Sequence, residues 1–243
     1  MIDLSGHNKP ALQFSGGKDS LACLYLLRAQ LDDITVYWLN TGDAYPETVD
    51  VIEQVKPWIP RFIEIKADVK GFRAINGNPS DLMPANAHPI AIGYGLGELP
   101  LVNRFDCCWQ NRMRPMHQRM LDDGVDLVIR GTKQADTGTV PAEGVVANLG
   151  YDIALPIRDW SHKEVFAYLD EVGAPRNAIY GFPEAISAPE CVGCTAWWGE
   201  GHSAHLKARH PGAYQSYRIH LTAIAATLQS HLDELQAELK TGA

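Results

Sequence analysis

A glycine-rich stretch near the N-terminus, FSGGKDS, separates a short apolar run from a helical one. The start of a helix offers unpaired N–H groups and a partial positive charge, which together attract anions. Gly16 and Gly17 let the backbone approach a phosphate because they carry no Cβ. Lys18 adds a full positive charge, and the hydroxyls of Ser15 and Ser20 can donate to phosphate oxygens. The sequence therefore predicts a phosphate site at this junction.

Asp19 lies in the same stretch and would repel a bare phosphate. We expect this carboxylate either to order the loop or to meet a magnesium ion, and we assign the catalytic roles to Lys18 and Asp19. The spacing differs from that of the common nucleoside triphosphatase loop, GxxxxGK[ST]. A glycine-rich turn with a capping serine is the plain structural alternative, and the loop by itself leaves that alternative open.

The five cysteines of the chain are unevenly placed. Cys107 and Cys108 are adjacent, and Cys191 and Cys194 form a CxxC motif. Four thiolates from two distant segments suit either a tetrahedral zinc ion or an iron–sulfur cluster. Adjacent ligands are awkward for one small ion because neighbouring side chains diverge, whereas several iron atoms give each thiolate its own metal. The spacing favours iron and leaves zinc, or no metal, open; Cys23 lies among leucines, where we expect it to be buried.

Apolar runs alternate with helical periods through the first two thirds of the chain, which is typical of parallel βαβ units. We expect strands at residues 10–14, 34–40, 61–66, 125–131 and 153–156. We expect helices at residues 21–31, 46–59, 110–121, 165–173 and 211–240, the last as one helix or two. The SHKE sequence at 161–164 fits a capping box. Residues 71–100 predict a long loop, with GYGLG as a flexible turn, and residues 174–201 predict a second irregular stretch.

Composition bounds the function. The formal net charge of −8 argues against broad, nonspecific binding to nucleic acid, which needs a basic face. A local basic pocket stays possible, with candidates at Arg112, Arg114, Lys133 and Arg158, although each also fits solvated surface. No secretory signal and no run of about 20 apolar residues is visible, so we expect a cytoplasmic protein with no membrane partner.

Two of these cations follow strands. Lys133 comes after residues 125–131, and Arg158 follows residues 153–156. At the carboxyl edge of a parallel sheet both side chains would face the crevice in which such folds bind nucleotides. The histidines show no HExxH motif, and His202, His205 and His210 are expected on solvated surface.

Three motifs together resemble a known family. SGGKDS resembles the PP-loop of the adenine-nucleotide α-hydrolase superfamily, which holds the pyrophosphate portion of ATP or its counterpart. NTGDAYPETVD, residues 40–50, resembles the DTGxxFPET segment of the phosphosulfate reductases, with Asn40 where that family usually has aspartate. LPIRDWSHKEVFAYLDEVGAP, residues 155–175, is similar to the segment around its DW[ST] motif. The resemblance covers residues 11 to about 201, and it implies nucleotide contacts at Thr41 and Gly42.

The cysteine segments extend the likeness. CCWQNRMRPM resembles the CCxxRKxxPL segment of the iron–sulfur adenosine phosphosulfate reductases, and CVGCTAWWGE resembles their CxxCT…GE segment. The resemblance implies a [4Fe–4S] cluster on all four paired cysteines, with Arg112 and Thr195 beside it. Arg112 falls where the family has a lysine, and Asn111 replaces its arginine, so the surroundings of the cluster differ in charge.

The resemblance also implies an α/β, Rossmann-like adenine-nucleotide α-hydrolase fold. Its central sheet would be mostly parallel and its C-terminal tail helical. We expect a nucleotide-binding domain with the cluster at residues 1–201 and a helical extension at residues 202–243.

One family feature is missing. These reductases attack sulfur with a thiolate on a C-terminal segment, typically ECGLH, and this chain has no cysteine after Cys194. Cys23, if buried, would be a poor nucleophile. The complete SGGKDS loop favours an ATP pyrophosphatase that uses Mg²⁺, releases AMP and pyrophosphate, and activates an acceptor for sulfur transfer.

Two alternatives stay open. One is a reductase of adenosine phosphosulfate (APS) or its 3′-phosphorylated form (PAPS) that takes its thiol from a partner protein or a small thiol. The other is a nucleotide-binding sensor without turnover. The nucleotide is accordingly ATP, APS or PAPS, the further partner is a thiol or sulfur-donor protein, and a homo-oligomer is not excluded.

Overall fold

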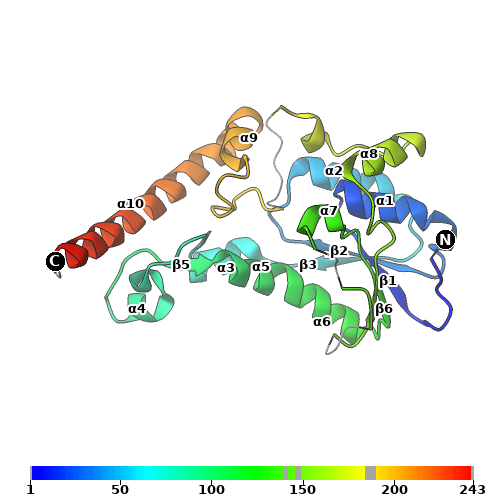
Figure 1. Cartoon of the computed structure of the whole chain (residues 1–243), viewed down its shortest axis with the longest axis horizontal. Coiled ribbons are helices and arrows are strands. Elements are labelled where there is room, and N and C mark those ends of the chain that lie inside the picture. The colour runs from blue at the N-terminus through cyan, green and yellow to red at the C-terminus, as the bar shows by residue number, and fades with distance from the viewer. Residues whose placement is uncertain (1, 140–141, 146–148, 184–189, 242–243) are drawn as a thin grey trace. The chain divides into compact units, whose positions relative to one another are not determined.

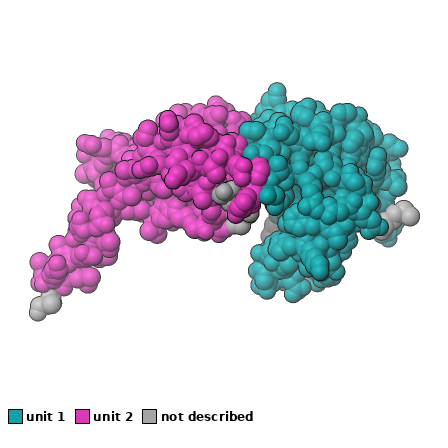
Figure 2. Space-filling model, turned by 90° about the horizontal axis from the view of Figure 1, so that it is seen from above, with its two compact units in different colours: residues 1–40, 45–67, 114–181 teal, residues 41–44, 68–113, 182–243 magenta. Residues whose placement is uncertain are grey.

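The chain forms two compact units, seen separately coloured in Figure 2. The computed structural model describes residues 2–139, 142–145, 149–183 and 190–241. Unit 1 comprises residues 1–40, 45–67 and 114–181, and unit 2 comprises residues 41–44, 68–113 and 182–243. The predicted boundary after residue 201 falls inside unit 2, and the expected division into two domains stays a prediction.

Unit 1 is built on a six-stranded sheet of order β3-β2-β1-β6-β8-β7. Its strands are β1 Pro10–Gln13, β2 Thr35–Asn40, β3 Phe62–Lys66, β6 Leu127–Ile129, β7 Gly144–Val145 and β8 Asp152–Ala154. All neighbouring pairs are parallel except β7 with β8. In register, Leu12 of β1 lies opposite Val36 of β2 and Ile129 of β6. The predicted α/β fold with a mostly parallel central sheet is confirmed.

Helices cover both faces of this sheet (Figure 1). They are α1 Lys18–Leu26, α2 Pro46–Val55, α6 Arg114–Asp122, α7 Gln134–Thr137 and α8 His162–Glu171, with short 3₁₀ turns η1 Arg28–Gln30, η2 Lys56–Trp58 and η5 Ala178–Gly181. Successive strand residues point to opposite faces. Leu12 therefore packs in the core under α1, α2 and α8, whereas Ala11 packs with Met120 of α6. The predicted capping box is present, with the Ser161 hydroxyl accepting from the backbone of Glu164 at 3.2 Å.

Unit 2 holds short elements and one long helix. These are α3 Val69–Asn76, β4 Asn78–Ser80, η3 Ala85–Ala87, α4 Pro89–Gly93, β5 Leu101–Asn103, α5 Arg104–Cys108, the π-helical turn η4 Trp109–Met113, α9 His202–Arg209 and α10 Pro211–Thr241. Strands β4 and β5 pair in parallel. The tail is a single helix, α10, as one of the two predicted forms. No helix among the described residues is long and apolar enough to cross a membrane.

The predicted loop over residues 71–100 is wrong. This segment contains most of α3, all of β4 and α4, and the turn η3. Its glycines and prolines mark the ends of short elements instead of a continuous loop. Gly77 ends α3 at a φ of +89°, where a Cβ would lie 1.9 Å from the carbonyl oxygen of Pro100. Pro89 occupies the first turn of α4, a position that needs no N–H donor. The irregular stretch expected at 174–201 lies partly outside the described residues.

Candidate functional site

The glycine-rich loop lies at the point where the strand order of the sheet reverses. β1 pairs with β2 on one side and with β6 on the other, and in such sheets ligands bind at the carboxyl ends of the strands beside the reversal. The loops after β1 and β6 are in direct contact here. A Cβ on Gly131 would lie 2.7 Å from the backbone carbon of Asp19 and 2.8 Å from the nitrogen of Ser20. A residue with a Cβ would not fit at position 131, so the close approach of these two loops requires Gly131, which belongs to none of the sequence motifs.

The loop is shaped by its two glycines and two serines. Gly16 adopts a φ of +76°, and a Cβ there would lie 2.9 Å from Cγ2 of Thr48. Gly17 is the N-cap of α1 and supplies no side-chain cap to the helix. The Ser20 hydroxyl accepts from the Ser15 N–H at 3.1 Å and donates to the Gly17 carbonyl at 3.0 Å. The folded loop therefore presents a helix N-terminus without a carboxylate or amide cap of its own.

Hydroxyl groups occupy the first N–H donors of this helix. The N–H of Lys18 donates to the hydroxyl of Tyr180 at 3.3 Å, and the N–H of Gly17 donates to the hydroxyl of Ser15 at 3.3 Å. Both distances exceed the usual range for N–H···O bonds, so both bonds are weak. A phosphate oxygen, which is charged, would be the stronger acceptor for these donors.

A ladder of alternating charges runs beside the loop. The Lys18 ammonium lies 2.5 Å from Asp19, and the Lys133 ammonium lies 2.7 Å from Asp19 and 2.8 Å from Asp136. Lys133 has no exposed surface. Burial opposes its charged form, but the hydrogen bonds to Asp136 and Asp19 outweigh burial and raise the pKa of Lys133. Lys133 thus holds the loop through its ion pair with Asp19.

Arg158 and Cys23 also lie in unit 1. The Arg158 guanidinium donates to Glu143 at 2.9 Å. The backbone carbonyl of Arg158 accepts from the N–H of Gln134 at 2.9 Å, so the backbone at Arg158 contacts the residue after Lys133. Cys23 is fully buried on α1, and burial raises the pKa of its thiol to about 12. A thiol in that state is a poor nucleophile.

Unit 2 brings the four paired cysteines together. Cys107, Cys191 and Cys194 pack in one buried cluster with Val69 and Ala196, and Cys108 interacts electrostatically with Cys107 and Cys194. Burial raises the pKa of the three buried thiols, in the case of Cys194 to about 12. The two segments that the sequence predicted to share a metal therefore do converge.

Two residues that the sequence analysis missed sit against these cysteines. Asp43 is buried and accepts from Nη1 of Arg73 at 2.7 Å and from the N–H of Gly193 at 2.9 Å. Its carbonyl accepts from the N–H of Val192 at 2.8 Å. Arg73 lies on α3, within residues 71–100, which the sequence predicted to be a loop because of their glycines and prolines. The Asp68 N-cap of α3, which accepts from Gly71 at 2.9 Å, is the signal that could have revealed the helix.

Two predicted neighbours of the cluster lie near the cysteines. Arg112 forms an ion pair with Glu190 and a hydrogen bond to Cys108; burial opposes its charge, but Glu190 and Cys108 raise its pKa. The Asn111 amide donates to the Cys107 carbonyl at 2.9 Å, with the Cys107 sulfur 3.9 Å away. Thr195 is fully buried and donates to the carbonyl of Pro79 at 2.5 Å.

Thr41 and Gly42, predicted to contact the nucleotide, belong to unit 2 and not to the unit of the glycine-rich loop. The Thr41 hydroxyl accepts from the Cys191 thiol at 3.6 Å, and Gly42 adopts a φ of +74°. The structure therefore groups Thr41 with the cysteines, while Ser15–Ser20, Lys133 and Arg158 form a separate group in unit 1.

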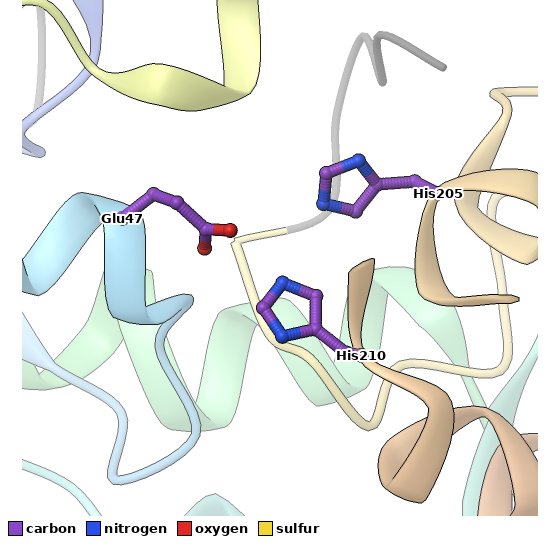
Figure 3. Close-up of side chains that lie close together, drawn as sticks. All are labelled: Glu47, His205 and His210. Carbon is purple, nitrogen blue, oxygen red and sulfur yellow. The ribbon is translucent and has the colours of Figure 1, made fainter. Parts of the chain in front are cut away.

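The prediction of solvated histidines is wrong for His202 and His205, which are both buried. The His202 ring stacks on Tyr217 with centroids 5.0 Å apart, and its Nε2 lies 3.0 Å from the Val192 carbonyl. The rings of His205 and His210 lie 5.5 Å apart (Figure 3). These side chains pack inward because α9 follows the CxxC turn closely in the sequence and lies against α10.

A cavity of about 540 Å³ adjoins this region of unit 2. Its walls are mainly apolar and come from the turn after the CxxC motif, α9 and the first half of α10. Trp198 and His202 line the cavity, as does Trp197, which also packs on the cysteine cluster.

A parallel sheet with a glycine-rich loop at its reversal point is the arrangement in which open α/β folds bind nucleotides. The phosphoadenosine phosphosulfate reductase domain matches residues 9–195, and the chain belongs to that family. It is 22% identical to adenosine 5′-phosphosulfate reductase of Allochromatium vinosum, over 82% of this chain and 80% of that protein. It is 25% identical to phosphoadenosine 5′-phosphosulfate reductase of Gloeobacter violaceus, over 80% of this chain and 75% of that protein.

The fold agrees with that membership. The crystal structure of phosphoadenylyl-sulfate reductase from Candida auris, solved as a phosphate complex, superposes with a TM-score of 0.54 at 17% identity. The match covers 73% of this chain and 79% of that chain. At this identity the likeness concerns the fold.

Proposed function

We propose that the protein is a sulfonucleotide reductase that acts on APS or PAPS and takes its thiol from another molecule. The observation that carries this proposal is the glycine-rich loop of unit 1, which offers weakly held N–H donors and Lys18 in a chain of the phosphosulfate reductase family. Relatives that span most of the chain are named as reductases of these two nucleotides.

The proposed reaction has two steps. A thiolate attacks the sulfur of the bound nucleotide, and the bond between sulfur and the phosphate oxygen breaks, so that AMP or its 3′-phosphorylated form leaves with the electron pair. A second thiol then attacks the resulting thiosulfonate at the thiol-derived sulfur and releases sulfite, leaving a disulfide. Sulfur is reduced by two electrons, which the two thiols supply.

The loop would act on the leaving group. Negative charge grows on the phosphate oxygen as the bond to sulfur breaks, and fixed donors aimed at that charge lower the barrier. Lys18 and the N–H groups at the start of α1 are those donors. Asp19, which pairs with both Lys18 and Lys133, would keep Lys18 in position.

The external thiol is proposed because no cysteine of these 243 residues suits the attack. Cys23 is fully buried with a pKa raised to about 12, and the other four cysteines gather in unit 2. Candidates for the donor are a small dithiol or a dithiol protein, which can supply both thiols of the two steps.

The residues of unit 2 fit an iron–sulfur cluster. Cys107, Cys108, Cys191 and Cys194 would hold the iron–sulfur cluster. Cys107, Cys191 and Cys194 pack in one buried group of side chains, and Cys108 interacts with Cys107 and Cys194. Adjacent cysteines suit a group with several metal atoms, which gives each thiolate its own iron. When bound, such a group would supply a buried centre of charge that fixes the 107–108 segment to the CxxC turn.

One observation favours a second function, ATP pyrophosphatase activity. The loop keeps the complete SGGKDS sequence, with Lys18 and Asp19 both in place. In that case Mg²⁺ would bridge the phosphates of ATP, an acceptor would attack the α-phosphorus, and pyrophosphate would leave. The two lysines already on Asp19 favour an ordering role for this carboxylate over a role as metal ligand.

The test is an anaerobic product analysis with ATP, APS and PAPS, each with dithiothreitol or a dithiol protein. Sulfite from either sulfonucleotide supports the proposal, whereas AMP and pyrophosphate from ATP alone support the second function. Nucleotide binding without product would mean a sensor. Lys18→Met should abolish turnover, while Lys163→Met, on the exposed face of α8, should not. Normal turnover by the Lys18 variant would overturn the role given to the loop.

A further inference from the structure

The guanidinium of Arg73 has a buried donor without an acceptor. Its side chain is only 9% exposed, and Nη1 donates to Asp43 at 2.7 Å. Its Nε–H is buried and has no hydrogen-bond partner among the described residues. An unsatisfied buried donor on a charged group is costly, and in native proteins it calls for a specific explanation such as a bound ion.

The surroundings of this guanidinium indicate what the acceptor is. The Cys107 thiol interacts with the Arg73 guanidinium, as do Cys191 and Cys194. A Cβ on Gly193, inside the CxxC turn, would lie 3.0 Å from Nη1 of Arg73. Thiols from both cysteine segments therefore interact with the Arg73 guanidinium, and the missing acceptor of its Nε–H is expected to be a sulfur atom too.

Asp43 fixes both partners of this arrangement. One oxygen, Oδ2, accepts from Arg73 and also from the N–H of Gly193. The carboxylate thus sets the position of the guanidinium relative to the turn that carries Cys191 and Cys194. Lys70 approaches the other oxygen at 3.6 Å, but its side chain is 69% exposed.

We propose that Arg73 is a further residue of the iron–sulfur site, where it donates to a sulfur of the bound cluster and sets a permanent positive charge against it. Asp43 is the positioning residue for Arg73. This inference rests on the cluster of the proposed function and assigns the cluster a contact from α3, outside both cysteine segments.

The reduction potential reports this contact directly. Net charge and hydrogen bonds to the sulfurs both set the potential of such clusters. Arg73→Gln removes the positive charge, so the midpoint potential should become more negative, and the iron and sulfide retained per chain should fall at least twofold. Arg73→Lys keeps the charge and should lie closer to the wild type in potential. Asp43→Asn should resemble Arg73→Gln, more weakly.

The experiment reconstitutes each full-length variant anaerobically with iron and sulfide. It then measures iron and acid-labile sulfide per chain and the midpoint potential by dye-mediated titration. Circular dichroism of the metal-free chains checks folding. Lys70→Gln is the matched control, because it removes a positive charge from the exposed side of the same helix and should change neither quantity.

The outcomes separate the two levels of the proposal. A wild-type chain that retains no iron and sulfide overturns the cluster and this inference with it, whereas sulfite release tests the reductase activity separately. A loaded wild type with an Arg73→Gln variant of equal iron content and equal potential overturns the role of Arg73 alone. A shift of equal size in Arg73→Lys and Arg73→Gln would overturn the assignment to charge.

Discussion

Replacing the buried Lys133 with methionine would test whether its ion pair with Asp19 holds the glycine-rich loop in place. The substitution keeps the length of the side chain and removes its charge. Lys133 has no exposed surface, and its ammonium makes contacts of 2.7 Å with Asp19 and 2.8 Å with Asp136. The variant therefore leaves two carboxylates without their shared cation.

The expected loss of stability follows from the exposure of those carboxylates. Removing one partner of a fully buried ion pair costs about 3–5 kcal/mol. The side chains of Asp19 and Asp136 are 23% and 34% exposed, so water recovers part of that cost. We expect a fall of about 2–3 kcal/mol in the free energy of unfolding, or a Tm lower by roughly 4–12 °C for a chain of this size.

Nucleotide affinity should fall as well. Two unit negative charges about 8 Å apart repel by roughly 2 kcal/mol before screening at an effective dielectric constant of about 20, and we take this as the order of the repulsion between Asp19 and a bound phosphate. Salt and the remaining Lys18 pair reduce this, and we expect APS to bind about tenfold more weakly. The double variant Lys133→Met/Asp19→Asn should recover part of that affinity because the repelling charge is gone.

The assays are thermal and urea-induced unfolding, both monitored by circular dichroism, and calorimetric titration with APS. Lys163→Met, a lysine exposed on α8, is the control and should change neither result. A Lys133 variant whose Tm lies within 1 °C of the wild type and whose Kd for APS lies within twofold would refute the reasoning.

Three further predictions follow from the geometry. Tyr180→Phe removes the hydroxyl that accepts from the Lys18 N–H at 3.3 Å, so nucleotide affinity, measured by calorimetry, should rise about two- to fivefold; weaker binding would mean that the hydroxyl contacts the nucleotide. Gly193→Ala places a Cβ 3.0 Å from Nη1 of Arg73 and from Oδ2 of Asp43, so the variant should have a lower Tm and a lower iron content. Gly212→Ala is the control, because no atom lies within 4 Å of its Cβ, and it should keep its iron content without a lower Tm. Equal behaviour of the two variants would contradict the crowding at the CxxC turn. Burial lowers the pKa of His202 to about 4, from an ordinary value of 6.5, so the unfolded chain takes up this proton first as the pH falls. The stability that is present above pH 6.5 is therefore lost toward pH 4, by up to about 3 kcal/mol. The free energy of unfolding, measured with urea at a series of pH values, should depend less on pH in His202→Phe, and an unchanged pH dependence would exclude His202 as the cause.

Much of unit 1 was readable from the sequence because its elements have strong periodicity. The strands β1, β2, β3 and β6 lie within the predicted ranges, and the capping box at Ser161 is present. Strand β8 begins one residue before its predicted range, and the short antiparallel strand β7 was not predicted. Unit 2 was not readable in the same way. Its helices α3 and α4 have eight and five residues, too short for a periodic signal, and glycine and proline mark their ends. Glycine and proline residues at the ends of these short helices were thus interpreted as a continuous loop.

The candidate sites divide along the same line. The residues of the glycine-rich loop and the four cysteines carry local motifs, and the structure places the loop in unit 1 and the cysteines in unit 2. Arg73, Asp43 and Gly131 have no motif, because their roles come from contacts with residues far away in the chain. The sequence singled out Lys133 but not its two carboxylate partners, because the contact with Asp19 joins distant parts of the chain and the contact with Asp136 depends on the turn that follows Lys133.

The discontinuity of unit 2 has a consequence for biogenesis. Its residues come from three stretches of the chain, and Cys107 and Cys108 are translated more than 80 residues before Cys191. At about 5–20 residues per second, the first pair emerges several seconds before the second can meet it. During that interval Cys107 and Cys108 lack the partners that bury them, and they are open to oxidation or to capture of a stray metal. The proposed metallocentre on all four cysteines would therefore be loaded only after translation has passed Cys194, and a reducing environment would protect the first pair until then.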